Sequence, residues 1–431
     1  MKNLTSMHSL ISRLRPKGRD RALAWGLVSA LAAAAPQALA ACPDIKGQGE
    51  VSFIGNSFPA VSHVARQVEA CARPGLKVTF KLTPQAREET ERAFAAGRSP
   101  FSGATVSMGE FVKFQSLGQL QPLTDLVDKY RARYKLEDGM LIRVNGQVMA
   151  VAFIQNAQNL FYRKDLFDKH GLKVPTTYAE MLQAAATLKT KEPGLEYPIA
   201  QTFAKGWDGA TEFANLLAGF GGRFFKPGTA QPAFNDEAGV KAIELMRQMT
   251  RFMTPNYLAS NSDDVMNQFQ QGRAAMGVLW ASRAARMDDP AASKVVGKMA
   301  FAAAPATTPG GKTASHLWWD AVVMPRNTSA DRDLAFQLLM EGLDEEAVKT
   351  GNDTAIWIRS VYKPTRFGTG VAAAAKAGAP IWPSEPFFSL AHAEVGKVLP
   401  EALTGTLSPK AVLDAAAQAY LKVAAEKGFV K

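Results

Sequence analysis

Three segments between residues 50 and 82 follow one another in the pattern of a strand, a helix and a second strand. Glu50–Gly55 is a short apolar run that ends at a turn, and Leu76–Leu82 alternates between apolar and polar residues, as strands do. Between them, the apolar residues of Pro59–Cys71 recur at helical spacing. Because two strands joined by one helix are typical of a parallel sheet, the sequence predicts an α/β fold.

The first forty residues have the three parts of a secretory signal peptide. Six basic residues and one acid among residues 1–21 precede an apolar stretch, Ala22–Ala35, and Ala38-Leu-Ala40 has the small residues of a cleavage site. We therefore expect cleavage after Ala40 and export to the periplasm; a membrane-anchored helix is the alternative. Six bases and one acid leave with the peptide, so the formal net charge falls from +11 to +6. The other Lys and Arg residues are scattered, which argues against nucleic-acid binding.

The sequence contains two cysteines, Cys42 and Cys71, and both follow the expected cleavage site. In an exported protein an even count indicates a disulfide, and this one would close a loop of about thirty residues, worth roughly 3–4 kcal/mol by chain entropy. Leu39-Ala-Ala-Cys42 also resembles a bacterial lipobox, in which Cys42 would carry lipid. We favour the disulfide, because lipidation would leave Cys71 unpaired in an oxidising compartment.

No pattern typical of an enzyme occurs in the sequence. The five histidines form neither an HxH nor an HExxH spacing, and neither Gly-x-Ser-x-Gly nor a Walker A loop is present. Adjacent carboxylates such as Asp263-Asp264 point apart on a helix, which is more typical of a solvated surface than of an acid–base pair. We expect no catalytic residue, no metal and no cofactor.

Four segments from residue 159 onward carry a family resemblance. Asn159–Leu182, with its Leu-Phe-Tyr-Arg-Lys-Asp-Leu-Phe core and Val-Pro-Thr-Thr-Tyr-Ala-Glu end, looks like a "lyYnkdlf…Gl…PkTwdEl" block, and three shorter segments follow it: Leu217–Phe225, Phe234–Met246 and Phe269–Trp280. In this order and spacing they resemble family 1 of the extracellular solute-binding proteins of bacterial ABC importers, the group that includes maltose-binding protein. Trp318-Trp319-Asp320 departs from the pair of glycines usual there, and the proline usual near position 152 is absent. Both changes concern the ligand rather than the fold.

The resemblance implies a two-lobe α/β fold of the periplasmic binding protein type (type II-like, Venus-flytrap), with a ligand cleft between the lobes. Lobe one would take residues 41–152 and 316–362, and lobe two residues 153–315 and 363–431. Two or three chain crossings would form the hinge, at Val148–Phe153, at Gly311–Ser315 and near Lys363-Pro364. Gly or Pro flanks these short segments, as suits positions that absorb a hinge rotation.

A sugar or polyol site combines aromatic rings, which pack on apolar faces of the ligand, with planar or charged hydrogen-bonding groups. By resemblance, Trp280 stands where family members stack a ring on the ligand, and Trp207 with Asp208 lies in a loop where they place a ligand-facing aromatic. Trp318 and Trp319 open an apolar strand. Because side chains alternate along a strand, at most one of these two rings faces the cleft.

Polar candidates complete the predicted site. Asp320 in an otherwise apolar strand is costly unless it pairs with ligand hydroxyls or with Arg359. Arg359 lies in a segment that resembles one whose arginine often reaches the ligand; the alternative is an ion pair between the lobes. The other candidates follow the first crossing or end predicted strands: Asn56, Ser57, Ser107, Gln155 and Asn156.

Together these features predict a monomeric periplasmic receptor that binds a carbohydrate or polyol and delivers it to the membrane permease of an ABC importer. A ligand that touches both lobes only in the closed form would shift the population toward that form. Two alternatives stay open. One is a binder of an anionic sugar derivative or small organic acid, favoured if Arg359 faces an acid rather than Asp320; the other is an exported polysaccharide-active enzyme.

Overall fold

The computed structural model describes residue 42 and residues 44–195 and 197–430. The predicted signal peptide, residues 1–40, lies outside this part of the chain. In the described part, no helix has both the length and the apolar composition needed to cross a membrane. Cys42 and Cys71 form a disulfide, with their Cα atoms 5.3 Å apart.

Most strands belong to one mixed sheet, in the order β2-β1-β3-β8-β5-β4. The strands are β1 (Gly49–Gly55), β2 (Leu76–Leu82), β3 (Gly103–Ser107), β4 (Leu141–Val144), β5 (Gln147–Arg163), β6 (Met276–Trp280), β7 (Met299–Ala303), β8 (Leu317–Val323) and β9 (Ile356–Trp357). β2, β1 and β3 are parallel, as the strand–helix–strand pattern predicts. The sheet as a whole is not parallel, because β8 runs antiparallel to both β3 and β5. Local periodicity carries no information on the direction in which so distant a segment enters the sheet.

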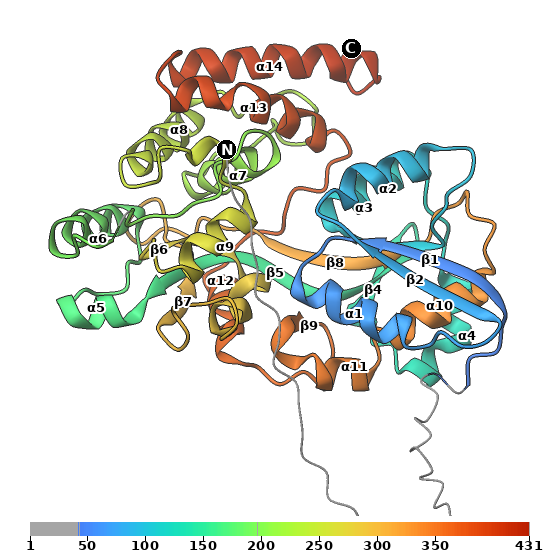
Figure 1. Cartoon of the computed structure of the whole chain (residues 1–431). Helices are drawn as coiled ribbons and strands as arrows, with labels where there is room; N and C mark the ends of the chain where they lie inside the picture. The colour runs from blue at the N-terminus through green and yellow to red at the C-terminus, as the bar shows by residue number, and fades with distance from the viewer. Residues whose placement is uncertain (1–41, 43, 196, 431) are drawn as a thin grey trace, which may run out of the picture. The chain divides into compact units, whose positions relative to one another are not determined.

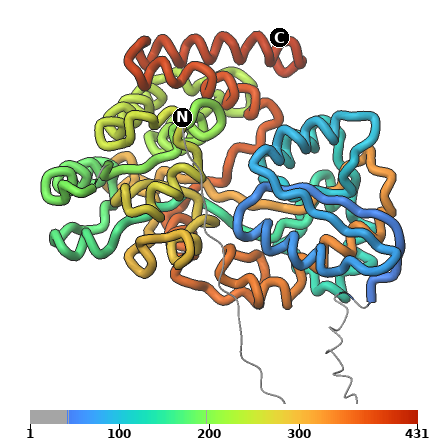
Figure 2. The backbone as a smooth tube through the Cα atoms, in the orientation of Figure 1, coloured from blue at the N-terminus to red at the C-terminus, as the bar shows by residue number. Residues whose placement is uncertain are grey.

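β5 is one continuous strand of 17 residues that changes partners along its length. It pairs with β8 as far as Ala157, and from Gln158 onward it pairs with β6 and β7 (Figure 2). The sequence predicts two separate segments here, because polar residues interrupt the apolar run. Asn156 and Gln158 are nevertheless buried and hydrogen-bonded by their side chains, so their polarity does not end the strand.

We use the name sheet lobe for strands β1–β4 and β8 together with helices α1–α4, α10 and α11. Helices cover both faces of its sheet. In Figure 1, α2 and α3 lie above this sheet, whereas α1, α4 and α10 lie below it. Phe53 and Ile54 are neighbours in β1 and therefore point to opposite faces, and both are completely buried, each in a different apolar cluster. The helices of the sheet lobe are α1 (Pro59–Glu69), α2 (Ala86–Ala95), α3 (Met108–Ser116), α4 (Thr124–Tyr134), α10 (Arg332–Glu341) and α11 (Glu345–Thr350).

The remaining helices surround the short antiparallel sheet of β6, β7 and the end of β5, and we call this part the helical lobe. They are α5 (Lys164–His170), α6 (Tyr178–Lys191), α7 (Trp207–Gly219), α8 (Glu237–Thr250), α9 (Ser262–Gln270), α12 (Thr369–Lys376), α13 (Phe388–Leu403) and α14 (Pro409–Glu426). The largest apolar cluster of the molecule lies here, and α13 packs between α7 and α14 in it. Helix α13 was not predicted from the sequence, and it contains the helix-unfavourable residues Gly396 and Pro400.

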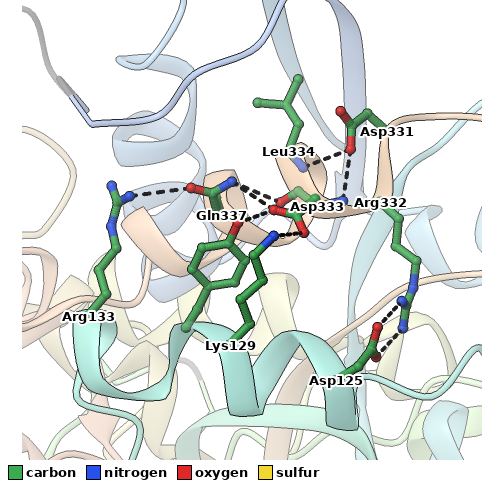
Figure 3. A network of polar contacts seen from close by, with 9 residues as sticks. Asp125, Lys129, Arg133, Asp331, Arg332, Asp333, Leu334 and Gln337 are labelled. Atoms are coloured by element: carbon green, nitrogen blue, oxygen red, sulfur yellow. Dashed lines mark hydrogen bonds and ion pairs between the residues drawn. The ribbon is translucent and has the colours of Figure 1, made fainter.

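Polar side chains join α4 to α10 on the surface of the sheet lobe (Figure 3). Arg332 pairs with both carboxylate oxygens of Asp125, at 2.5 and 2.7 Å, and Lys129 lies 2.7 Å from Asp333. Asp331 caps the first turn of α10. These pairs are exposed or partly exposed and add little to stability, so the apolar contacts of α4 underneath hold it in place.

Candidate functional site

A cavity of about 390 Å³ opens where the carboxyl ends of β1 and β3 face the starts of α7 and α9. Parallel strands of α/β sheets place their loops at this edge, which is where such sheets bind ligands. The helical lobe contributes Trp207, Trp280 and Arg283, and the sheet lobe contributes Asn56, Arg87, Glu110 and Asp320. The cavity therefore has walls from both lobes.

Three tryptophans form its apolar wall. The rings of Trp207 and Trp280 stack with their centroids 6.0 Å apart, and Trp318 lies edge-on to Trp280 at 5.2 Å. Trp207 opens α7, Trp280 ends β6 and Trp318 lies in β8. Three elements that are distant in sequence thus present indole surfaces to one cavity, and such surfaces suit the C–H faces of a sugar or polyol.

Alternation along β8 separates Trp318 from Trp319, as the sequence predicts. Trp318 lines the cavity, whereas Trp319 packs edge-on against Phe111 of α3, with centroids 5.3 Å apart. The expected ligand contact of Trp319 is therefore wrong, because its ring fills the core under α3 instead.

Charged side chains gather around Asp208, the second residue of α7. The guanidinium of Arg87 lies 4.5 Å from the centre of the Trp207 ring, and Arg283 forms an ion pair of 2.9 Å with Asp263. Burial raises the pKa of Asp208 to about 6, and the positive charges of Arg87 and Arg283 oppose that rise. Arg87 comes from α2 of the sheet lobe, so its contact with Trp207 bridges the two lobes.

Asp320, on β8 of the sheet lobe, is a half-buried carboxyl that lines the same cavity. It lies opposite Ser107 in the β3–β8 register, and Ser107 caps α3 together with Glu110, whose carboxylate accepts the Ser107 hydroxyl at 2.6 Å. Within the described part of the chain, no Lys or Arg forms an ion pair with Asp320 or Glu110. Burial, and then the charge of Glu110, raises the pKa of Asp320 to about 8. The Asp320 carboxyl is therefore protonated near neutral pH and can donate one hydrogen bond to a hydroxyl.

Arg359 is not the partner of Asp320, and it does not line the cavity. Its guanidinium donates hydrogen bonds to the carbonyl oxygens of Tyr134 and Lys135, at 2.9 and 3.2 Å. These contacts tie the segment after β9 to the end of α4, inside the sheet lobe. The predicted ligand contact of Arg359 and its alternative role as an ion pair between lobes are both wrong, because the side chain satisfies backbone carbonyls of a helix end.

Two thirds of the predicted ligand residues meet in this cavity: Asn56, Ser107, Asn156, Trp207, Asp208, Trp280, Trp318 and Asp320. Ser57 and Gln155 are exposed and lie outside the lining, like Trp319 and Arg359. For Asn156, the side chain donates to the Ser282 hydroxyl at 3.2 Å and accepts the backbone N–H groups of Ala157 and Ser282. Its polar atoms therefore hold the turn after Trp280 in place.

Sequence reasoning missed Arg87, Arg283 and Glu110. Arg87 lies in the first turn of α2, just after the carboxyl end of β2, so the rule that selected Asn56 after β1 would also have found it. Arg283 follows Trp280 by three residues in the 3-10 segment Ala281–Asp288. Among the described residues, no group of three or more His, Cys, Asp and Glu side chains could hold a metal ion.

Comparisons with known proteins agree with this architecture. The family of bacterial extracellular solute-binding proteins matches residues 64–349. A mannitol-binding protein of Pseudomonas aeruginosa is 25% identical over 376 residues, which is 80% of this chain and 85% of that protein.

Two solved structures share the two-lobe fold. An ABC transporter solute-binding protein from Agrobacterium radiobacter K84, in complex with ribitol, has a TM-score of 0.77 at 22% identity and covers 88% of this chain and 99% of its own. One from Agrobacterium vitis S4, with bound D-mannitol, has a TM-score of 0.75 at 20% identity and covers 89% and 100%. The prediction of a two-lobe α/β fold is confirmed.

Proposed function

The chain belongs to the bacterial extracellular solute-binding protein family, and we therefore propose that it is the periplasmic receptor of an ABC importer for a small neutral polyol or monosaccharide. The observation that carries the proposal is one cavity lined by the rings of Trp207, Trp280 and Trp318 together with the polar groups of Asp208 and Asp320. At about 390 Å³ the cavity lies toward the small end of the ~300–1,000 Å³ typical of small-molecule sites. The named relatives, which bind mannitol or ribitol, agree with a ligand of this size.

The charges of the cavity favour a neutral ligand over an anionic one. Its lining contains five carboxyl groups, those of Glu88, Glu110, Asp208, Asp263 and Asp320, against the guanidinium groups of Arg87 and Arg283. Arg283 already pairs with Asp263, and Arg87 lies over the Trp207 ring. An anionic sugar would bring a further negative charge beside Glu110, which forms no ion pair among the described residues, and this costs free energy. The residue that the anionic alternative required, Arg359, lies elsewhere.

Closure of the two lobes around the ligand is the proposed mechanism. We keep the lobe division predicted from sequence, with residues 41–152 and 316–362 in lobe one and residues 153–315 and 363–431 in lobe two. The apolar clusters follow it in outline, although Phe153 and Ile154 pack in the sheet lobe and Trp318 packs with the helical lobe. A ligand held between Trp280 and Asp320 touches both lobes only when they are closed, so its binding energy favours that form. The closed form would dock on the permease, and the receptor would act as a monomer without catalysing a reaction. Cleavage after Ala40, followed by the Cys42–Cys71 disulfide in the periplasm, completes the proposal.

Calorimetry on the chain from Ala41 to Lys431 tests this function. Mannitol, ribitol, glucose and maltose represent neutral ligands, and gluconate and glucuronate are their anionic counterparts. We expect one-to-one binding of at least one polyol or monosaccharide, with compaction in solution scattering and no product formed from it. Binding of the acids alone would establish the anionic alternative, and turnover of a sugar would establish an enzyme.

A further inference from the structure

A second cavity, of about 380 Å³, lies directly behind the first. The two cavities share five lining residues: Arg87, Ser107, Glu110, Trp207 and Trp318. Trp207 and Trp318 therefore have one surface on each cavity, and the two spaces are neighbouring parts of one cleft. On its far side, the second cavity is closed by α3 of the sheet lobe and by the segment that leads into α13.

The walls of the second cavity are mostly apolar. The Trp382 ring lies 4.2 Å from that of Trp318 and 5.1 Å from that of Phe388, centroid to centroid, and Pro383 and Val112 extend this surface. His392 is also buried here. Burial lowers its pKa to about 3, so the ring is neutral, and its Nε2 atom lies 3.2 Å from the Thr211 hydroxyl.

Most charged groups of this cavity lie at its rim, and Arg87 and Glu110 lie where it joins the first cavity. Glu385 and Lys397 are exposed, and Glu91 pairs with Lys113 at 2.6 Å. A second sugar ring would bury several hydroxyls against the faces of the Trp318, Trp382 and Phe388 rings, which offer them no hydrogen bond, and this burial is costly. An apolar group of similar size would gain from the same burial.

We propose that the second cavity holds an apolar substituent, aryl or alkyl, carried by the polyol or sugar in the first cavity. The physiological ligand is then an amphipathic glycoside or polyol ether, whose hydroxylated part is the polyol or monosaccharide of the proposed function. This inference rests on the proposed function, because the first cavity must hold the hydroxylated part of the same molecule. The substituent would pass between Arg87 and Trp318, which line both spaces.

Gly109 offers a way to fill the second cavity alone. It lies in the first turn of α3 and lines the second cavity but not the first. A β-carbon at this position would lie 3.7 Å from Trp382 Nε1 and 3.9 Å from Trp318 Cζ3, which is ordinary contact. Gly109→Ala should therefore fit, whereas the longer side chain of Gly109→Leu would enter the cavity. Both substitutions also favour the helix.

The test measures affinities by calorimetry for matched pairs of ligands. The pairs are the methyl and phenyl glycosides of glucose, mannose and galactose, and D-mannitol with 1-O-benzyl-D-mannitol. In the unsubstituted protein, we expect the aryl member of at least one pair to bind about tenfold tighter, or more, since burial of a phenyl group supplies that factor. Gly109→Leu should abolish this advantage and leave the affinity for the small member within about twofold, and Gly109→Ala should retain it.

Each outcome separates the two proposals. If a methyl glycoside or mannitol binds and no aryl member binds more tightly, the second-cavity inference is wrong while the proposed function stands. An aryl advantage that persists in Gly109→Leu would place the substituent elsewhere and also overturn the inference. If no member of any pair binds and none of the sugars tested above does, both proposals fail.

Discussion

Gly396 in α13 lies in backbone contact with Gly206, the residue that precedes Trp207. A β-carbon built on Gly396 would lie closer than 3.0 Å to the carbonyl oxygen of Gly206, and the N–H of Gly206 donates to the Gly396 carbonyl at 3.2 Å. Gly206 itself has a φ of +96°, which favours glycine. A contact between two glycines thus sets where α7 begins and where the Trp207 ring lies.

Substitution of Gly396 should therefore affect both stability and binding. In Gly396→Ala, the new methyl group must push α13 away from Gly206, at a cost of about 1–3 kcal/mol in unfolding free energy, and Trp207 should move with its helix. Thermal unfolding and calorimetry with the best-bound polyol would measure the two effects. Gly194→Ala is the matched control, because a β-carbon there meets nothing within 4 Å. Equal behaviour of the two variants would show that the close approach does not matter.

Trp280 and Trp319 make a matched pair of tryptophans inside and outside the cavity. Trp280→Ala removes one of the two stacked rings of the wall, so we expect a loss of affinity of about tenfold or more for the bound polyol. Trp319→Ala removes a ring that packs on Phe111 and should lower stability with little effect on affinity. Titration of intrinsic fluorescence, with the melting temperature as a folding check, distinguishes them. An intact affinity in folded Trp280→Ala would remove this ring from the proposed site.

Asp320 should make stability fall as the pH rises. Its pKa is about 8 in the folded protein against 3.8 for an ordinary aspartate, so the folded state retains a proton that the unfolded state loses. The stabilising effect of that proton is complete below about pH 4 and is lost progressively as the pH rises to about 8, at a rate of at most ~1.4 kcal/mol per pH unit.

Asp320→Asn keeps the size of the side chain and removes its titration. Between pH 6.5 and 8, the melting temperature of the parent should therefore fall relative to that of the variant. His316 and His392, whose pKa values burial lowers, are present in both proteins, so their contributions cancel in this difference. Parallel stability curves over the interval would mean that Asp320 is ionised throughout.

The disulfide of Cys42 and Cys71 closes a loop with a sequence separation of 29 residues. Its reduction should lower the unfolding free energy by roughly 3–4 kcal/mol, because the unfolded chain regains the entropy of that loop. Urea unfolding with and without dithiothreitol measures the difference. The double variant Cys42→Ser/Cys71→Ser should be as unstable as the reduced parent and should not respond to the reductant. Insensitivity of the parent itself would favour the lipobox alternative for Cys42.

Local sequence pattern was sufficient to predict an element where that element buries only one of its faces. The strand Leu76–Leu82 has the predicted bounds, because alternation directly reports which side chains are buried. The separation of Trp318 from Trp319 follows from the same alternation. Blocks of family resemblance in their expected order then indicated the two-lobe arrangement.

Long-range packing decided the rest, because it brings together groups that no local pattern relates. α13 forms despite Gly396 and Pro400, since its contacts with α7 and α14 outweigh their poor helix propensity. Arg359 has the positive charge that a partner of Asp320 needs. Its guanidinium nevertheless donates to the carbonyl groups at the end of α4 and not to the Asp320 carboxyl. Arg87 reaches the cavity only because α2 faces the start of α7. Residue type and spacing thus determined the elements and the class of fold, whereas the approach of distant backbones determined which side chains share the cleft.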